Sequence, residues 1–491
     1  MAYETAAGMT DTIESVIGLE VHAELLTRSK IFCSCSAEFG APPNTNVCPV
    51  CLGMPGVMPV LNRQVIDFAI RAGLATHCTI ALRSVFARKN YFYPDLPKGY
   101  QITQYELPIC LDGFLDVVVG DATRRIGLTR IHMEEDTGKN IHDADVLGSL
   151  VDFNRSCVPL LEIVSEPDMR TPEEAGAYLR TLRSILQYLE ICDGNMEEGS
   201  FRCDANISVR PTGSTTLGTK VEIKNMNSFR AVEKAIAYEI HRQREALVDG
   251  EPIVQETRLW DADRDETRSM RSKESAHDYR YFPEPDLPPL LLEEESVTRI
   301  RGSLPELPAE RRARFVRDYD IRAEDADVLT QRKDVANYFE AGVRAGAPAK
   351  EMANWTMTEL LRLIREEKLD RALVIHDWPI SAKQLAGLAT LVVDGTVTRN
   401  TAKKLLPKLQ GTDQDPAVLV EAEGLSQVSD RDALTRLVAE VVSTHPDQAE
   451  QFRAGKDKVV GYLVGQVMKA SQGKANPQVV QELLREALRG A

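Results

Sequence analysis

Three adjacent carboxylates lie between a histidine and a lysine in the segment 131–139, which reads Ile-His-Met-Glu-Glu-Asp-Thr-Gly-Lys. Like charges a few ångströms apart raise one another's pKa or recruit a positive partner. Glu, Asp and His also supply the oxygen and nitrogen ligands that a divalent cation accepts. The segment indicates either a cation site or a solvated acidic turn, and its spacing alone does not decide between them.

Further polar side chains fall on segments with the alternation of a β-strand. Segment 16–26 alternates apolar and polar residues, so Glu20, His22 and Glu24 share one strand face. The polar outer face of an edge strand is the alternative explanation, and it suits Glu24 better than Glu20 and His22. Two further segments, 201–210 and 221–228, place on one face each Arg202, Asp204, Asn206 and Ser208, and Glu222, Lys224 and Met226. Charges on these two faces cost less if they surround an ion and a phosphate, whereas a hydrated sheet face explains any single residue equally well but both strands together less well.

Four of the nine cysteines form two close pairs, Cys33 with Cys35 and Cys48 with Cys51, separated by twelve residues. Four thiolates in this pattern favour a tetrahedral zinc ion over free thiols. Because sulfur would fill all four positions, the ion would be structural.

Aromatic residues and lysines crowd the turn-rich segment 88–104. Loops with many distinctive side chains are more often sites than spacers. Lys89 and Lys98 could neutralise the acidic run or contact a phosphate, or they could be ordinary surface lysines.

Helices are expected between these strand and loop segments. Apolar spacing predicts a helix over 62–74, and Thr171, Pro172 and Glu174 predict a capping box and the start of another. Asn227 or Ser228 should cap a third. Segment 260–271 is expected to be a charged loop, and the proline-rich segment 278–289 a stiff closing segment.

Beyond a boundary expected near residue 295, charged helix formers dominate through 369, and 409–416 is expected to be a linker. The formal charge of −15 argues against wholesale binding of nucleic acid, so such a partner needs a local patch. A basic stretch in 453–480 could provide it, or could be a solvated helix end. Its candidate nucleic-acid contacts are Lys456, Lys458, Lys469 and Lys474.

The chain of 491 residues should hold two to four domains. No apolar run reaches the roughly 18 residues of a membrane span, and residues 1–14 look like a loose tail, not a signal peptide. We therefore expect a cytoplasmic protein without membrane contact. The chain lacks a P-loop and the other common nucleotide and hydrolase motifs, so ammonia from an amide donor would have to come from another chain.

Several motifs together resemble the GatB/GatE family, which provides the B subunit of the aspartyl/glutamyl-tRNA amidotransferases, over nearly the whole chain. They are the two cysteine pairs and the segments 18–22 (Gly-Leu-Glu-Val-His), 89–95 (Lys-Asn-Tyr-Phe-Tyr-Pro-Asp), 132–138 (His-Met-Glu-Glu-Asp-Thr-Gly), 202–206 (Arg-Cys-Asp-Ala-Asn) and 279–286 (Tyr-Arg-Tyr-Phe-Pro-Glu-Pro-Asp).

The resemblance implies an α+β fold. A cradle-like catalytic domain with a mixed or antiparallel sheet and a zinc loop at 33–51 would span 1–295. An all-α helical domain at 296–410 and a small YqeY-like tRNA-binding tail domain at 411–491 would follow.

The implied reaction is that of a carbon–nitrogen ligase. ATP would phosphorylate the side-chain carboxylate of Glu or Asp on misacylated tRNA(Gln) or tRNA(Asn), and ammonia would then displace phosphate. Implied partners are an amidase-type glutaminase chain, a small third chain of a heterotrimer, the tRNA and a non-discriminating aminoacyl-tRNA synthetase.

The resemblance also assigns residues to these roles. Glu20, His22, Glu135 and Asp204 would bind Mg²⁺ beside Glu134 and Glu222. Glu135, Lys89 and Lys98 would line the path of ammonia, and Arg202, Asn206 and Lys224 would hold ATP.

Two other functions fit parts of the sequence. A zinc-containing tRNA-binding module would explain the thiols and the basic tail but not the carboxylates. A self-sufficient ligase that takes free ammonia would differ only in needing no partner chain.

Overall fold

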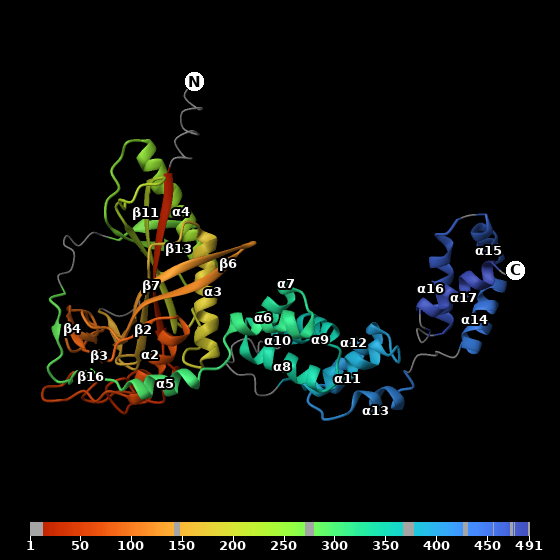
Figure 1. Ribbon diagram of the computed structural model, residues 1–491, viewed down its shortest axis with the longest axis horizontal. Helices are drawn as coiled ribbons and strands as arrows, with labels where there is room; N and C mark the ends of the chain where they lie inside the picture. Colours follow the sequence, from red (N-terminus) through yellow and green to blue (C-terminus); the bar gives the residue numbers. More distant parts are fainter. Residues whose placement is uncertain are drawn as a thin grey trace, which may run out of the picture. The chain divides into compact units, whose positions relative to one another are not determined.

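The computed structural model describes residues 13–141, 148–270, 279–366, 378–425, 431–454, 456–471, 475 and 477–489. Two compact units make up the chain, Met1–Leu307 and Pro308–Ala491. The first carries the β-sheets, and the second is built from helices (Figure 1). No helix among the described residues is long and apolar enough to span a membrane.

The first unit is organised around a nine-stranded sheet in the order β14-β13-β12-β11-β1-β10-β7-β6-β2. All neighbours run antiparallel except β12 and β13, which are parallel. This confirms the predicted mixed sheet. The strands are β1 (Ile13–Glu24), β2 (Thr79–Ile80), β6 (Cys110–Val119), β7 (Ala122–Glu135), β10 (Pro159–Ser165), β11 (Phe201–Pro211), β12 (Val221–Lys224), β13 (Thr257–Asp261) and β14 (Glu266–Ser269).

Three smaller sheets accompany it, in the orders β15-β4-β5, β16-β3 and β8-β9. The first joins the proline-rich segment to the lysine-bearing segment, because Phe282 pairs with Arg88. Their strands are β3 (Arg83–Ser84), β4 (Ala87–Asn90), β5 (Tyr100–Thr103), β8 (Lys139–Ile141), β9 (Leu150–Asp152), β15 (Phe282–Pro283) and β16 (Leu290–Leu291).

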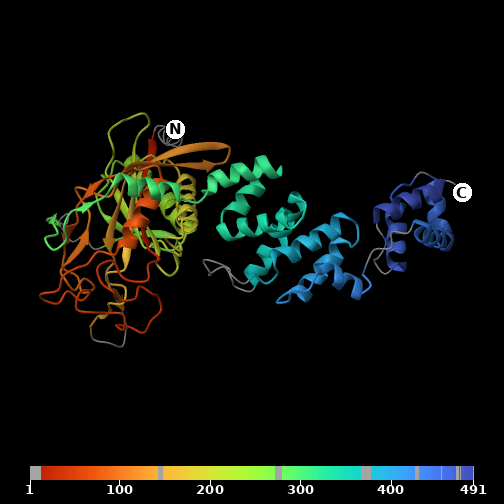
Figure 2. The same ribbon diagram turned by 60° about the horizontal axis from the view of Figure 1, so that its bottom comes forward.

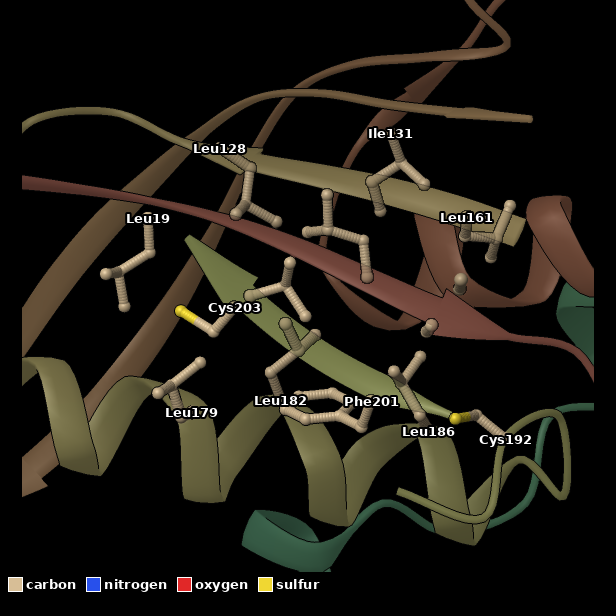
Figure 3. Close-up of a cluster of buried hydrophobic side chains, with 14 of the residues drawn as sticks. Leu19, Leu128, Ile131, Leu161, Leu179, Leu182, Leu186, Cys192, Phe201 and Cys203 are labelled. Carbon is tan, nitrogen blue, oxygen red and sulfur yellow. The ribbon is translucent and has the colours of Figure 1, made fainter. Parts of the chain in front are cut away.

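Helices cover one face of the large sheet. Figure 3 shows Leu179, Leu182 and Leu186 of helix α3 directed at Leu19 and Phe201 of the strands. Figure 2 shows the same sheet and helices from a second direction. The helices of this unit are α2 (Arg63–Ala75), α3 (Pro172–Tyr188), α4 (Phe229–Val248) and α5 (Glu294–Gly302).

The predicted helix starts are present. Side chains of Asn62, Thr171 and Ser228 each accept a backbone N–H of the first turn of α2, α3 and α4. Glu174 departs from the predicted capping box, because its carboxylate accepts the N–H of Arg170 and not that of Thr171. The N-terminus of α3 is therefore capped by the hydroxyl of Thr171.

Alternation along the strands separates an apolar from a polar face. Leu19 and Val21 of β1 lie in the core, so Glu20, His22 and Glu24 point to the other face, as predicted. Strand register brings further polar positions beside them. The pairs across β1 are Glu20 with Asp204, His22 with Arg202 and His22 with Glu162.

Segment 260–271 was predicted to be a loop, and this was wrong for much of its length. β13 and β14 form a hairpin there, with Asp261 opposite Glu266. Arg268 lies 3.2 Å from Asp261 and 2.9 Å from Glu266, so ion pairs within the hairpin accommodate the charges that suggested a loop.

The described residues of the second unit form two apolar cores. Leu419 and Val420 of α13 pack in the first of them, beyond the expected linker. The helices are α6 (Pro308–Tyr319), α7 (Ala323–Thr330), α8 (Lys333–Arg344), α9 (Ala349–Trp355), the π-helix η1 (Thr356–Leu360), α10 (Leu361–Glu366), α11 (Ala382–Val393), α12 (Arg399–Leu409), α13 (Pro416–Ala422), α14 (Arg431–Thr444), α15 (Pro446–Arg453), α16 (Val459–Ala470) and α17 (Pro477–Arg489).

Candidate functional site

A cavity of about 290 Å³ lies on the polar face of the large sheet. Side chains from several strands and from the segments that follow β5 and precede β15 surround it, so residues distant in sequence meet there. The lining residues are Glu20, His22, Lys89, Thr103, Gln104, Tyr105, Arg130, His132, Glu134, Glu162, Asp204, Glu222, Lys224, Tyr279 and Tyr281.

One histidine and two glutamates form a compact group in this cavity. The Nε2 atom of His22 lies 3.2 Å from Oε2 of Glu162 and 3.7 Å from Oε1 of Glu134. One ligand atom of each residue falls within 4.8 Å of the other two. Strand pairing explains the grouping, because His22 opposes Glu162 and Glu162 opposes His132, two residues before Glu134. We call His22, Glu134 and Glu162 the acidic triad.

Electrostatics in the triad depend on two imidazoles, that of His22 within it and that of His132 beside it. Burial opposes the charged form of His22, but the hydrogen bond and negative charge of Glu162 outweigh it and raise the pKa of His22. Burial and Glu162 would raise the pKa of Glu134, yet His132 and His22 prevail and lower it. Burial opposes ionisation of Glu162 too, and His132 and His22 lower its pKa. Both carboxylates are therefore held as anions inside the protein.

The triad suits a divalent ion. Ligand atoms of two carboxylates and one imidazole lie within 4.8 Å of one another, and carboxylates are the ligands that Mg²⁺ and Mn²⁺ prefer. Each carboxylate has near partners in this cavity. They are the imidazoles of His22 and His132, the guanidinium of Arg130 at 3.9 Å from Glu162, and the hydroxyl of Thr103, which donates to Glu134. An ion would add positive charge beside two adjacent buried anions.

A second polar group adjoins the triad in the same cavity. Lys224 lies 2.5 Å from Asp204 and 3.2 Å from Glu222. Burial and the charges of neighbouring acids, Glu162 first among them, raise the pKa of Glu20. Asn206 donates to Oε1 of Glu20 at 2.9 Å, so it acts on the cavity through Glu20.

Tyrosines form another part of the wall. The rings of Tyr105 and Tyr281 stack with centroids 4.0 Å apart, and Tyr279 meets Tyr281 edge-on at 6.0 Å. The ammonium group of Lys89 lies 4.9 Å from the ring of Tyr279. Burial opposes its charge, but Glu134 and other neighbours raise its pKa, so Lys89 brings a positive charge to the cavity.

The structure does not bring Glu135 into the group with Glu20, His22 and Asp204 that was predicted to bind magnesium. Along β7, Ile131 and Met133 face the core, and Glu135 shares their side of the strand. Its fully buried carboxylate is ion-paired with Lys98 and accepts the N–H of Ile102 at 2.8 Å. Glu134 and Glu162 occupy the positions that face the cavity.

Lys98 accompanies Glu135 on that side. It lines a different cavity, of about 230 Å³, together with Gly53, Tyr100 and Asp286. Burial opposes its charge, but Glu135 raises its pKa to about 12, so Lys98 stays protonated at neutral pH. Lys89 and Lys98, predicted to act together, therefore line different cavities.

Arg202 was predicted to hold ATP, but its side chain forms ion pairs with two acidic residues. Its guanidinium lies 2.8 Å from Asp136 and 3.3 Å from Glu24. Burial and Asp136 together raise the pKa of Glu24 to about 8. Arg202 thus balances acids at the end of β1 and lies outside the lining of the triad's cavity.

The four cysteines predicted to bind zinc come together, and we call Cys33, Cys35, Cys48 and Cys51 the four-cysteine group. Their sulfur atoms all lie within 4.8 Å of one another, and those of Cys48 and Cys51 are 3.9 Å apart. The thiols interact with one another, because a hydrogen bond between Cys33 and Cys51 raises the pKa of Cys33 and lowers that of Cys51. The geometry fits a tetrahedral zinc ion.

In the tail, Lys456, Lys458 and Lys469 are exposed, as a contact with a phosphate backbone requires. Lys474 lies outside the described residues.

Glu162 was missed as a site residue in the sequence. It is the only charged residue in the otherwise apolar run 158–164, which was a usable signal. His132 was recognised in its motif but received no role, and it lies 3.5 Å from Glu134 and 3.8 Å from Glu162.

The fold and site define a class of protein with a polar-faced mixed-sheet domain, which carries an acidic triad and a four-cysteine group, followed by helical domains. Residues 15–298 match the GatB/GatE catalytic domain, and residues 337–488 match the GatB domain.

Two relatives align with nearly the whole chain. One from Thermodesulfovibrio yellowstonii is 54% identical over 97% of this chain and 99% of its own length. One from Geobacter sulfurreducens is 57% identical over the same shares. Both are named as the B subunit of aspartyl/glutamyl-tRNA(Asn/Gln) amidotransferase. The chain belongs to this B-subunit family.

Proposed function

We propose that this chain carries the ATP-dependent step of a tRNA amidotransferase. The substrate is Glu on tRNA(Gln), Asp on tRNA(Asn), or both. The side-chain carboxylate takes the γ-phosphoryl group of ATP, which leaves ADP and an acyl phosphate. The lone pair of ammonia then attacks the acyl carbon, phosphate leaves with the bonding electrons, and the nitrogen loses a proton to give the amide.

The acidic triad is the observation that carries this proposal. His22, Glu134 and Glu162 would hold Mg²⁺, with Glu20 and Asp204 close by. When bound, the ion neutralises phosphate charge during phosphoryl transfer. Our proposal gives this role to Glu134 and Glu162, whereas the family resemblance suggested Glu135.

Cationic side chains of the cavity would orient the phosphates. Lys89 and Lys224 line the cavity and keep their positive charges, since neighbouring acids raise the pKa of both against the effect of burial. Phosphoryl transfer depends mainly on positioning and charge neutralisation, which these groups supply.

Ammonia would arrive from a glutaminase chain, with a small third chain holding the other two together. Lys98 and Glu135 are our candidates for its path, because this buried ion pair lies on the other side of β7 from the triad and Lys98 reaches a second cavity. A non-discriminating synthetase would supply the misacylated tRNA.

The remaining groups would support this reaction. Zinc in the four-cysteine group would brace the loop 33–51. The exposed Lys456, Lys458 and Lys469 would contact the tRNA backbone, whose shape the helical parts would recognise. We place the reaction in the cytoplasm.

The test is ATP cleavage and amide formation on Glu-tRNA(Gln) by the chain with its partner chains and ammonium chloride in place of glutamine. Activity should vanish in Glu162→Gln and survive an inactivated glutaminase chain. Glu340→Gln, a buried acid of the helical unit, is the matched control and should remain active. Activity that is indifferent to both Glu134→Gln and Glu162→Gln would reduce the chain to a tRNA-binding module.

A further inference from the structure

One buried hydroxyl touches the triad directly. Oγ1 of Thr103, the last residue of β5, donates to Oε2 of Glu134 at 3.0 Å. Thr103 and Glu134 are each only 2% exposed, so water does not readily replace this contact. A buried carboxylate oxygen that loses its donor pays the full desolvation penalty.

The two oxygens of Glu134 have different surroundings. Oε2 is held by Thr103 and lies 3.5 Å from Nε2 of His132. Oε1 lies 3.7 Å from Nε2 of His22, on the side of the triad. The hydroxyl therefore selects which oxygen is left for an ion.

Strand β5 is itself firmly placed. The N–H of Ile102 donates to Oε1 of Glu135 at 2.8 Å, and the side chain of Gln101 donates to the carbonyl of Glu135 at 2.6 Å. These contacts anchor β5 to the end of β7. A substitution of Thr103 should therefore remove the hydroxyl without displacing the strand.

We propose that Thr103 is a positioning residue, which fixes the carboxylate of Glu134 so that Oε1 faces the ion. This inference rests on the proposed metal role of the acidic triad. Hydrogen bonds to ligating carboxylates orient them, and their loss typically weakens metal affinity about 10- to 100-fold.

Three variants of the full-length chain test it, with Mn²⁺ as the probe and free Mn²⁺ followed by EPR. Thr103→Val keeps the shape and removes the hydroxyl, and should raise the Kd for Mn²⁺ about 10- to 100-fold. Thr103→Ser restores a hydroxyl and should bind within a few-fold of the parent chain. Thr267→Val is the matched control, since Thr267 is 3% exposed and its hydroxyl donates to buried Glu239 at 3.3 Å outside the cavity.

An unchanged Kd in Thr103→Val would overturn the inference, as would equal weakening in Thr103→Ser and Thr103→Val. Thermal midpoints measured without metal show whether a variant is generally destabilised. Thr103→Val and Thr267→Val should be destabilised to a similar extent, since each loses one buried hydroxyl. Parent-like Mn²⁺ binding in Glu162→Gln would overturn the metal role of the triad, and this inference with it. Loss of binding in Glu162→Gln with none in Thr103→Val would overturn the positioning role alone.

Discussion

Buried carboxylates occur in both units of the chain, but their partners differ. Glu340 in the helical unit is paired with Arg311, with Arg314 at 2.7 Å and with the hydroxyl of Tyr319 at 3.0 Å. Glu162 in the sheet unit has His22 at 3.2 Å, while Arg130 is 3.9 Å away.

The difference is what we expect between an acid that serves the fold and one that serves the proposed ion site. Two guanidinium groups and a hydroxyl satisfy Glu340 within the fold. The triad instead places two anions at a cavity, with imidazoles as near partners and room for a further cation. Substitution should therefore change ion binding and activity at the triad, and stability at Glu340.

The largest expected effect is that of Glu162→Gln. Glutamine keeps the size of the side chain and an oxygen for the hydrogen bond of His22, so the fold should persist. Loss of the ion's charge stabilisation is worth several kcal/mol, which corresponds to about a 1000-fold fall in ATP-dependent amide formation. Steady-state assays with ammonium check this, and a fall of less than about tenfold would make Glu162 as dispensable for chemistry as Glu340.

The second-largest effect is expected for Cys51→Ser, which should reduce the stability of the fold. Loss of a structural zinc ligand is expected to lower the free energy of unfolding by about 3 kcal/mol or more. Cys192→Ser, at another fully buried cysteine outside the four-cysteine group, is the control. Denaturant unfolding with zinc quantified by a chromogenic chelator tests it, and equal losses in both variants would contradict a metal role.

Glu340 should show a smaller, pH-dependent effect. Burial opposes its ionisation, but Arg314 and Arg311 lower its pKa to about 2. A lowered pKa gives stability that is complete above the unfolded value near 4.5 and is lost as pH falls from about 5 towards 2. The contribution is on the order of 2 kcal/mol after a discount for solvent screening of the ion pairs.

Unfolding curves of the parent chain and Glu340→Gln between about pH 2 and 7 measure this contribution. The two should differ most near neutral pH and converge at low pH. A constant difference across the range would show that Glu340 is not held as an anion by its arginines.

The smallest effects belong to the exposed lysines of the tail. Lys456→Ala, Lys458→Ala and Lys469→Ala should each weaken tRNA binding by about 1 kcal/mol or less and leave the triad's ion binding unchanged. Each lost phosphate contact should also lower the salt dependence of binding by about one unit of slope. Binding isotherms at several salt concentrations test this, and unchanged slopes would remove these lysines from the tRNA contact.

The sequence predicted the features that depend on local periodicity. Alternation in 16–26 placed Glu20 and His22 on one face, and cap residues such as Thr171 located helix starts. The choice between Glu134 and Glu135 could have been made from the alternation of apolar Ile131 and Met133 with polar His132 and Glu134, which puts Glu135 on the apolar side of β7. As the single charged residue in an apolar run, Glu162 could have been recognised as unusual, but its partnership with His22 follows only from the register of β1 and β10.

Nitrogen coupling to bound Mn²⁺ is the most direct test of whether the triad is an ion site. Pulsed EPR of the full-length chain with one equivalent of Mn²⁺ should show modulation from an imidazole nitrogen. Modulation should disappear in His22→Ala, and tight binding should be lost in Glu162→Gln. Mn²⁺ bound without nitrogen coupling, or with equal affinity in Glu162→Gln, would contradict the assignment of His22, Glu134 and Glu162 to the ion.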